Sequence, residues 1–273
     1  MSTSPLTPAL SPRGERGPGP GFEKLIDREH HVAEIRLSAG RGNVIDRALC
    51  ERLAAVFGEL GADRAIHCVI LSASGPDFSW GASVPEHMPG EVDRMLPALH
   101  GLAQALVDSR LPVAALVRGR CLGGALELVL CAHHVIVAEN ATLGLPEVKL
   151  GVFPPLGATL LPFRVSQPVV DRMVTRGDVL DAAEAVSVGL ADELTSDAAL
   201  ADHGRRWASA YETLSGSSIR FACEAARRGF RDALGEPLTR LEALYLGRLL
   251  ETHDGVEGVR AFVEKRTPRW QHR

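Results

Sequence analysis

Two glutamates, Glu127 and Glu147, lie in apolar stretches of the chain, where a carboxylate is costly unless it is paired or used. Glu127 follows the Gly123-Gly124 pair, which predicts the start of a short helix with open amide N–H groups. The positive end of that helix dipole favours developing negative charge on an oxygen. Glu147 follows Pro146, twenty positions further on. Two carboxylates near one set of amide donors suit acid/base chemistry on a carbonyl compound.

Each of these features also has an ordinary structural explanation. A glutamate on the first turn of a helix usually only compensates the helix dipole and is solvated. A Gly-Gly pair before a helix often marks no more than a tight turn. The combination favours the chemical interpretation, because the surroundings of both carboxylates are too apolar for an ordinary surface.

The runs GGALEL and PEVKLGVFP, with their glutamates twenty residues apart, closely resemble the crotonase family, also called the enoyl-CoA hydratase/isomerase superfamily. The resemblance extends over nearly the whole chain after about Gly21. It implies that Glu127 and Glu147 are the catalytic acid/base pair of an enoyl-CoA hydratase, and leaves open which is the acid. Two carboxylates in a dry site cannot both ionise easily, so one should hold a proton near neutral pH.

A hydratase acting on a thioester needs two preorganised donors for the oxyanion. The Gly124 backbone N–H is one candidate. The loop DFSWGASVPEH resembles the family's F-x-x-G-A-D stretch, which places the second donor on Ala82. Ser83 stands where the family usually has Asp, but a backbone N–H donates whatever its side chain is. Without the family match, this loop would be interpreted as a plain glycine-containing turn.

After Glu147 the sequence departs from the commonest family pattern. Many members have Pro-Gly-x-Gly-Gly-Thr, whereas this chain has PPLGAT from Pro154, which is stiffer and more apolar. The pattern GASV-x-EH-x-P with LGVFPP and LLP is similar to the cyclohexa-1,5-diene-1-carbonyl-CoA hydratases, so we expect a pocket for a bulky, cyclic acyl group. His87 and His100 are candidates to line it, although each is better explained as an ordinary helix-surface or core histidine. The residues expected to bind the substrate are Trp80, Gly81, Ser83, Gly123, Phe153, Pro155 and Leu156.

The segment EGVRAFVEKRTPRW near the C-terminus resembles the family's closing helix. The resemblance implies that Phe262 and Lys265, with Arg266 adjacent, approach the adenosine end of CoA, often in a neighbouring subunit's site. A cation there suits a phosphate. The alternative is a solvated basic helix end favoured by the dipole.

Strands and helices alternate between Phe22 and Pro154, which predicts an α/β fold with parallel pairing. The family resemblance implies a crotonase-like spiral of ββα units. Past Pro154 the pattern predicts almost only helices, and apolar residues on more than one face of the last ones favour assembly. We expect a disordered tail over 1–21, a core domain over 22–200 and a C-terminal helical oligomerisation region over 201–273 that forms homotrimers or dimers of trimers. The helices expected past Pro154 are Pro168–Arg176, Asp181–Val188, Ala198–Tyr211, Ile219–Leu234, Leu238–Glu251 and Val256–Lys265.

Composition narrows the function classes. A net charge of −4 and a pI near 6.2 give no support to nucleic-acid binding, and no apolar run is long enough to span a membrane. The five cysteines are scattered without a CxxC motif, which indicates buried thiols in a reducing cytoplasm. His133-His134 has no third metal ligand at useful spacing and fits a helix C-terminus better. We therefore expect no metal and no cofactor, with CoA entering as part of the substrate.

Two rival functions remain at this point. A double-bond isomerase or a CoA-thioester hydrolase would keep the fold and change the reaction, but isomerases of the family commonly keep only one of the two glutamates. A non-enzymatic RNA-binding or scaffold protein of the same fold would show lost glutamates or a basic face, and the sequence shows neither.

Overall fold

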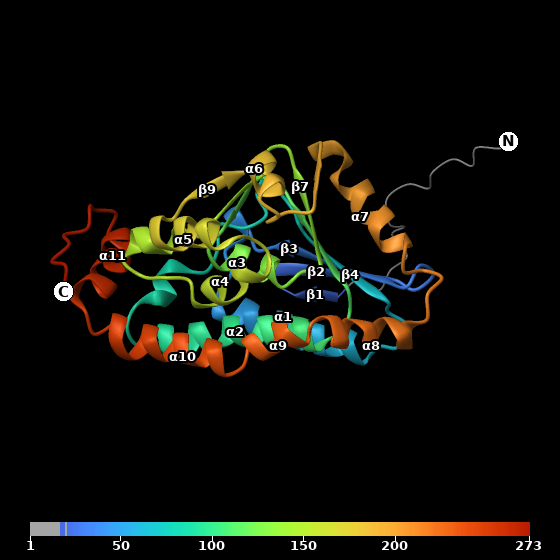
Figure 1. Ribbon diagram of the computed structural model, residues 1–273, viewed down its shortest axis with the longest axis horizontal. Coiled ribbons are helices and arrows are strands. Elements are labelled where there is room, and N and C mark those ends of the chain that lie inside the picture. Colours follow the sequence, from blue (N-terminus) through green and yellow to red (C-terminus); the bar gives the residue numbers. More distant parts are fainter. Residues whose placement is uncertain (1–16, 20) are drawn as a thin grey trace.

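A seven-stranded sheet forms the centre of the computed structural model, which describes residues 17–19 and 21–273 (Figure 1). Neighbouring strands are parallel from β3 to β10, and antiparallel between β1, β2 and β3. In spatial order the strands are β1 (Gly17–Gly19), β2 (Gly21–Asp27), β3 (Val32–Ser38), β4 (Cys68–Ala73), β5 (Val113–Val117), β7 (His134–Ala138) and β10 (Glu193–Thr195).

A second sheet of three short strands branches off beside β5 and β7. It contains β6 (Arg120–Leu122), β8 (Thr142–Gly144) and β9 (Val179–Asp181) in that order. Because the strands of both sheets succeed one another in chain order, the backbone advances along the molecule with each turn. This is the α/β spiral that the sequence predicted.

The two faces of the large sheet carry different helices, because successive strand residues point to opposite sides. On β3 and β4, Ile35 and Leu71 belong to the main core with α1 (Arg47–Ala62) and α2 (Val92–Asp108). On the same strands, Val32 and Ile70 pack instead with α7 (Leu200–Ser209). Figure 1 shows α1 and α2 on one side and α7 on the other.

Helix α1 forms as its sequence predicts. The Asp46 side chain accepts a hydrogen bond from the Leu49 N–H at 2.7 Å and so caps the first turn. The predicted apolar stripe is buried: Leu49, Leu53, Val56, Phe57 and Leu60.

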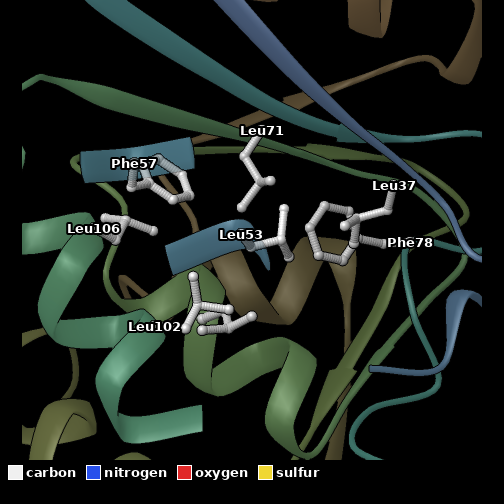
Figure 2. A pocket seen from close by; sticks show the side chains of 8 residues that line it. Leu37, Leu53, Phe57, Leu71, Phe78, Leu102 and Leu106 are labelled. Carbon is white, nitrogen blue, oxygen red and sulfur yellow. The ribbon is translucent and has the colours of Figure 1, made fainter. Parts of the chain in front are cut away.

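The main core is closed between α1, α2 and the sheet. Figure 2 shows apolar side chains, among them Leu53, Phe57 and Leu102, around a cavity of about 10 Å³. Its lining offers no polar group to hold a water molecule, and ligand pockets are typically hundreds of Å³. The acyl group of a substrate must therefore bind elsewhere.

The region after Pro154 is mostly helical, but several of its details differ from the prediction: a helix begins already at Pro155, and the helix predicted over Leu238–Glu251 ends at Leu244 and is followed by a π-helical turn. Strands β9 and β10 were missed, since three residues are too short for a detectable alternation. The single helix predicted over Ile219–Leu234 is two helices, because the backbone of Arg227 leaves the helical region at φ −101° and ψ 10°. Besides α7, the α-helices of this region are α4 (Pro155–Leu160), α5 (Gln167–Arg176), α6 (Ala182–Ser187), α8 (Gly216–Ala226), α9 (Arg228–Ala233), α10 (Glu236–Leu244) and α11 (His253–Val263).

The predicted tail, 1–21, lies mostly outside the described residues, although 17–19 form β1 and Gly21 begins β2. The predicted boundary at residue 200 falls on the first residue of α7, whose Leu200 and Ala208 pack against the large sheet. The division into a core and an oligomerisation region stays a prediction. Another expectation is wrong: His134 begins β7 and does not end a helix.

Candidate active site

Glu127 is fixed by a glycine turn that only glycine can make. Gly123 has φ 52° and ψ −131°, and its N–H donates to the Gly144 carbonyl at 2.9 Å, which ties the turn to the second sheet. Helix α3 (Gly124–Leu130) follows at once, and every one of its residues is buried. Glu127, on its first turn, is only 3% exposed.

The Glu127 carboxylate is held by the start of another helix. Its Oε1 accepts a hydrogen bond from the Gly157 N–H at 2.7 Å. Pro155 and Leu156 form the first turn of α4, whereas a stiff loop was expected from the sequence. Leu156 is fully buried in the main core. Burial raises the pKa of Glu127, while the Gly157 amide and the charge of His100 oppose that rise.

The carboxyl group of Glu147 has fewer hydrogen-bond partners than that of Glu127. It lies on the 3-10 turn η3 (Pro146–Leu150), and its Oε2 is buried without a hydrogen-bond partner among the described residues. Burial, and then the negative charge of Glu127, raise the pKa of Glu147 well above its ordinary value. Of the two carboxyl groups, Glu147 therefore holds its proton more readily than Glu127 does.

The two carboxyl segments meet at Gly123. A Cβ atom on this residue would lie 2.6 Å from Oε1 of Glu147, which is closer than real Cβ contacts. The missing side chain is therefore what allows the Glu147 carboxyl group to rest on the backbone that begins α3.

Two free backbone amides lie beside this point, and their role as an oxyanion hole stays a prediction. The neighbouring groups are used: Ile45 N–H donates to the Gly81 carbonyl at 3.0 Å and Ser83 N–H to the Ile45 carbonyl at 2.9 Å. Within the described part of the chain, neither the Ala82 N–H nor the Gly124 N–H has an acceptor. A Cβ on Gly124 would lie 3.2 Å from the Ala82 nitrogen, so the two donors are adjacent.

Trp80 has contacts that sequence reasoning did not anticipate. Its Nε1–H donates to Asp77 at 2.8 Å, and the guanidinium group of Arg120 stacks 4.3 Å from its ring centroid. The ring also packs closely over Gly42, where a Cβ would lie 2.3 Å away. These contacts fix Trp80 two residues before Ala82, and its role against the acyl group stays a prediction.

Phe153 packs against an apolar cluster that Ala82 also contacts. The cluster joins α2 to the C-terminal helices, and half-buried Ala82 and Phe153 pack against it. The Phe153 and Tyr245 rings are 5.4 Å apart, centroid to centroid. The buried members are Val92, Met95, Leu96, Val152, Tyr245 and Val259.

Sequence reasoning missed Tyr245 altogether and left His100 undecided. His100, on α2, is buried; its Nδ1 is hydrogen-bonded to Glu242 of α10 at 2.6 Å, and its Nε2 has no partner among the described residues. Tyr245 is 1% exposed, and its hydroxyl is likewise without a partner. His87 is bonded to the Ser83 carbonyl at 2.9 Å, and burial lowers its pKa. No sequence signal pairs α2 with α10, because these contacts span over a hundred residues.

The C-terminal candidates lie at the surface. Phe262 is 55% exposed, and Lys265 is exposed just after α11. The Arg266 guanidinium is bound to the Glu257 carboxylate at 2.6 and 2.9 Å, so it is already paired. Among the described residues, no contact joins Phe262 or Lys265 to Glu127 or Glu147 of the same chain. Their role in a neighbouring subunit's site stays a prediction.

Neither a metal cluster nor a membrane helix emerges from the described residues. Over 17–19 and 21–273, no three His, Cys, Asp or Glu side chains are grouped to hold a metal ion. In the same ranges, none of the helices has the length and apolarity that crossing a membrane requires.

The sequence as a whole matches one family. A model of the enoyl-CoA hydratase/isomerase family matches residues 27–273. The chain therefore belongs to this family, as its GGALEL and PEVKLGVFP motifs predicted. The two glutamates, the paired glycines and the Ala82 loop all lie within the matched range.

Three comparisons place the chain more closely. A cyclohexa-1,5-dienecarbonyl-CoA hydratase from Thauera aromatica is 39% identical over 249 residues, which is 91% of this chain and 96% of that protein. A probable enoyl-CoA hydratase from Mycobacterium bovis is 31% identical, covering 91% of this chain and 98% of its own. The crystal structure of an enoyl-CoA hydratase/isomerase from Pseudoalteromonas atlantica has a TM-score of 0.83 at 23% identity, over 92% of this chain and 99% of that one, and shows the shared fold. The predicted resemblance to cyclohexadienecarbonyl-CoA hydratases is thus confirmed at the level of sequence.

Proposed function

We propose that this protein is a hydratase that adds water to an α,β-unsaturated acyl-CoA thioester. The observation that carries the proposal is the meeting of two carboxyl groups, buried Glu127 and Glu147 with its buried Oε2, beside two adjacent amides on Ala82 and Gly124 that have no acceptor among the described residues. The names of the relatives support the same reaction class and the same CoA carrier.

Each group has one task in the reaction. Glu127, ionised and held by the Gly157 amide, takes a proton from water while the water oxygen bonds to the β-carbon. The displaced electron pair moves to the thioester oxygen, which the Ala82 and Gly124 N–H groups stabilise. Glu147 then gives its proton to the α-carbon as the carbonyl re-forms. Glu127 ends protonated and Glu147 ionised, and one proton returns from Glu127 to Glu147 before the next cycle.

This chemistry needs no further group. Proton transfer by two carboxyl groups and charge stabilisation by two amides supply every step of adding water, so the proposed enzyme uses no metal and no cofactor, with CoA as part of the substrate. A thioester hydrolase would attack the carbonyl carbon and release free CoA, and an isomerase would leave the mass of the ester unchanged. Mass spectrometry of the products therefore separates the three reactions.

We expect a cyclic dienoyl-CoA to be the better substrate. The 39% identical relative is named for such an ester, and the aromatic side chains of Phe153 and Tyr245 offer a rigid apolar wall beside Ala82. A rigid ring loses less entropy against such a wall than a flexible chain does. We predict that kcat/KM for cyclohexa-1,5-diene-1-carbonyl-CoA exceeds that for crotonyl-CoA by at least about tenfold, or about 1.4 kcal/mol.

A variant of the wall makes this comparison sharper. Phe153→Ala should lower the ratio of kcat/KM for the cyclic ester to kcat/KM for crotonyl-CoA, chiefly by lowering kcat/KM for the cyclic ester. Phe163→Ala, at an exposed phenylalanine, should leave this ratio unchanged. Equal or better use of crotonyl-CoA by the parent protein would assign it to the general short-chain hydratases.

We expect the protein to assemble as a homotrimer or a dimer of trimers. Large apolar side chains remain exposed on the C-terminal helices, with Phe221 at 70% and Phe262 at 55%. Light scattering after size exclusion should give the mass of three or six chains. A clean monomer at micromolar concentration would contradict the prediction, and with it the placing of Phe262 and Lys265 in a neighbour's site.

We also place the protein in the cytoplasm, with an acyl-CoA as its partner and neither nucleic acid nor a membrane. The support is the state of the cysteines, all five of which are buried, unpaired thiols. Burial raises the pKa of each, for example that of Cys50 to about 12, so these thiols are unreactive.

A further inference from the structure

Tyr245 carries a buried hydroxyl that the fold itself does not use. The residue is 1% exposed, and no described residue accepts or donates a hydrogen bond at its hydroxyl oxygen. Most buried tyrosine hydroxyls are paired, since an unpaired one costs stability and a phenylalanine of nearly the same shape would avoid that cost. An orphan hydroxyl of this kind calls for a partner that arrives with the reaction.

The backbone is irregular at Tyr245. Helix α10 ends at Leu244, and the chain continues as a π-helical turn, η6 (Tyr245–Leu249), in which the Leu250 N–H donates to the Tyr245 carbonyl at 3.1 Å. Such turns are rare and occur frequently at functional sites. Here the turn begins at the residue whose ring packs on Phe153 and joins the apolar cluster beside Ala82.

The Tyr245 side chain packs with the segment that follows Glu147: Val152 belongs to the same cluster, Ala82 packs against it, and the Val152 N–H donates to the Glu147 carbonyl at 3.2 Å. Burial raises the pKa of Tyr245, and the charges of Glu147 and then Glu127 raise it further, so the phenol keeps its proton and can donate. Glu147 Oε2 is itself buried without a described partner. The Tyr245 hydroxyl and Glu147 Oε2 are thus a donor and an acceptor, both buried and both without a partner among the described residues, and a small molecule bonded to both would satisfy them.

We propose that the Tyr245 hydroxyl is a third polar group of the reaction site, which holds the oxygen of the reacting water beside Glu147 and Glu127. This inference rests on the proposed hydratase function. The hydrogen-bond count fits a water molecule: it accepts from Tyr245, donates one hydrogen to Glu127 and the other to Glu147 Oε2, and keeps one lone pair. That lone pair is free to bond to the β-carbon while Glu127 removes the proton.

The proposal makes Tyr245 a direct contact of the water and, by reversal of the reaction, of the hydroxyl in the product. The enoyl substrate has no such hydroxyl, so it should bind equally well without the phenol oxygen. The hydroxyacyl product should bind less well. A residue that merely packs in the wall would affect both esters through its ring and neither through its oxygen.

The test is Tyr245→Phe, which removes one oxygen and keeps the ring. We expect kcat for hydration to fall by about tenfold or more while KM for the enoyl ester stays within about twofold. In the dehydration direction, KM for the hydroxyacyl ester should rise about threefold or more, the effect of one lost neutral hydrogen bond. The melting temperature should be unchanged or higher, because no protein partner loses a bond.

Tyr211→Phe is the matched control, since Tyr211 is the other tyrosine of the chain and lies on the α7 face of the sheet. It should leave all of these kinetic values at the parent level. If the parent protein hydrates an ester and Tyr245→Phe has the same kcat, the inference about Tyr245 is wrong while the proposed hydratase function stands. A parent protein that adds water to no ester of the panel would overturn the proposed function, and the inference with it. A Tyr245→Phe protein that is markedly less stable would show that the hydroxyl has a structural partner, and would also overturn it.

Discussion

Glu127→Gln and Glu147→Gln should each lower the hydration rate by roughly 10²–10⁴-fold, the usual effect of losing a positioned acid or base. The amide keeps the size of the carboxyl group but cannot exchange the proton that the reaction moves. Because the pair acts as a unit, the double variant should be little slower than either single variant. Rates with the preferred enoyl ester, followed by mass spectrometry of the hydrated product, measure the effect.

The control for these variants is Glu139→Gln, at an exposed glutamate after β7. It should hydrate at the parent rate. If either site variant, shown by circular dichroism to be folded, also hydrated at the parent rate, the two-carboxyl mechanism would be wrong. The oxyanion amides would then have to act with another proton donor.

The same carboxyl group has a consequence for stability. The pKa of Glu147 is raised in the folded protein, so folding favours its protonated form. Its contribution to the free energy of unfolding is full below the ordinary pKa of an unfolded glutamate, about 4.3, and is lost as pH rises through the raised folded value. Relative to Glu147→Gln, the parent protein should therefore lose stability as pH rises from about 4 towards 8.

Removing the neighbouring charge should move this titration. The charge of Glu127 is one cause of the raised pKa of Glu147, so Glu127→Gln should lower the pKa of Glu147. The loss of stability with rising pH should then begin at lower pH than in the parent protein. These shifts report the pair itself, because Gln cannot titrate.

How much of this site can be predicted from the sequence depends on how far apart in the chain the contacting residues lie. Asp46, Gly123 and Glu127 could be predicted because a cap, a glycine turn and a first-turn carboxylate are set by residues within a few positions of each other. The Ala82 amide could be predicted only through a family motif. Its freedom from hydrogen bonds follows from the pairing of its loop with Ile45, which lies in a separate segment.

What could not be predicted depends on long-range packing. No local pattern shows that the first turn of α4 donates to Glu127 from thirty residues away, or that Glu242 of α10 binds His100. In the sequence, Tyr245 cannot be told from the other apolar positions of a C-terminal helix. Its π-helical turn and its contact with the Phe153 ring are seen only in the structure. The acid and base roles proposed here likewise rest on the unequal hydrogen bonding of the two carboxyl groups.

Among substitutions of residues that have no side-chain functional group, Gly123→Ala should lower kcat the most. An alanine would have to adopt φ 52° and ψ −131°, a conformation that costs of order 1–3 kcal/mol. Its Cβ would also lie 2.6 Å from Glu147 Oε1 and force the carboxyl group away. Displacing a reacting group by about 1 Å can cost about 10²-fold in rate, and we expect a loss in kcat of at least that size.

Gly101→Ala separates this effect from a general response to added bulk. Gly101 is exposed on α2 with no atom within 4 Å of its missing Cβ, so alanine there should be neutral or stabilising by up to about 1 kcal/mol, with full activity. Thermal unfolding and kcat should be measured for both variants with the same ester. A Gly123→Ala protein that folds and reacts like the parent would mean that Glu147 can leave the α3 turn without loss. The close packing of the two carboxyl segments would then be a feature of the fold and not of the reaction.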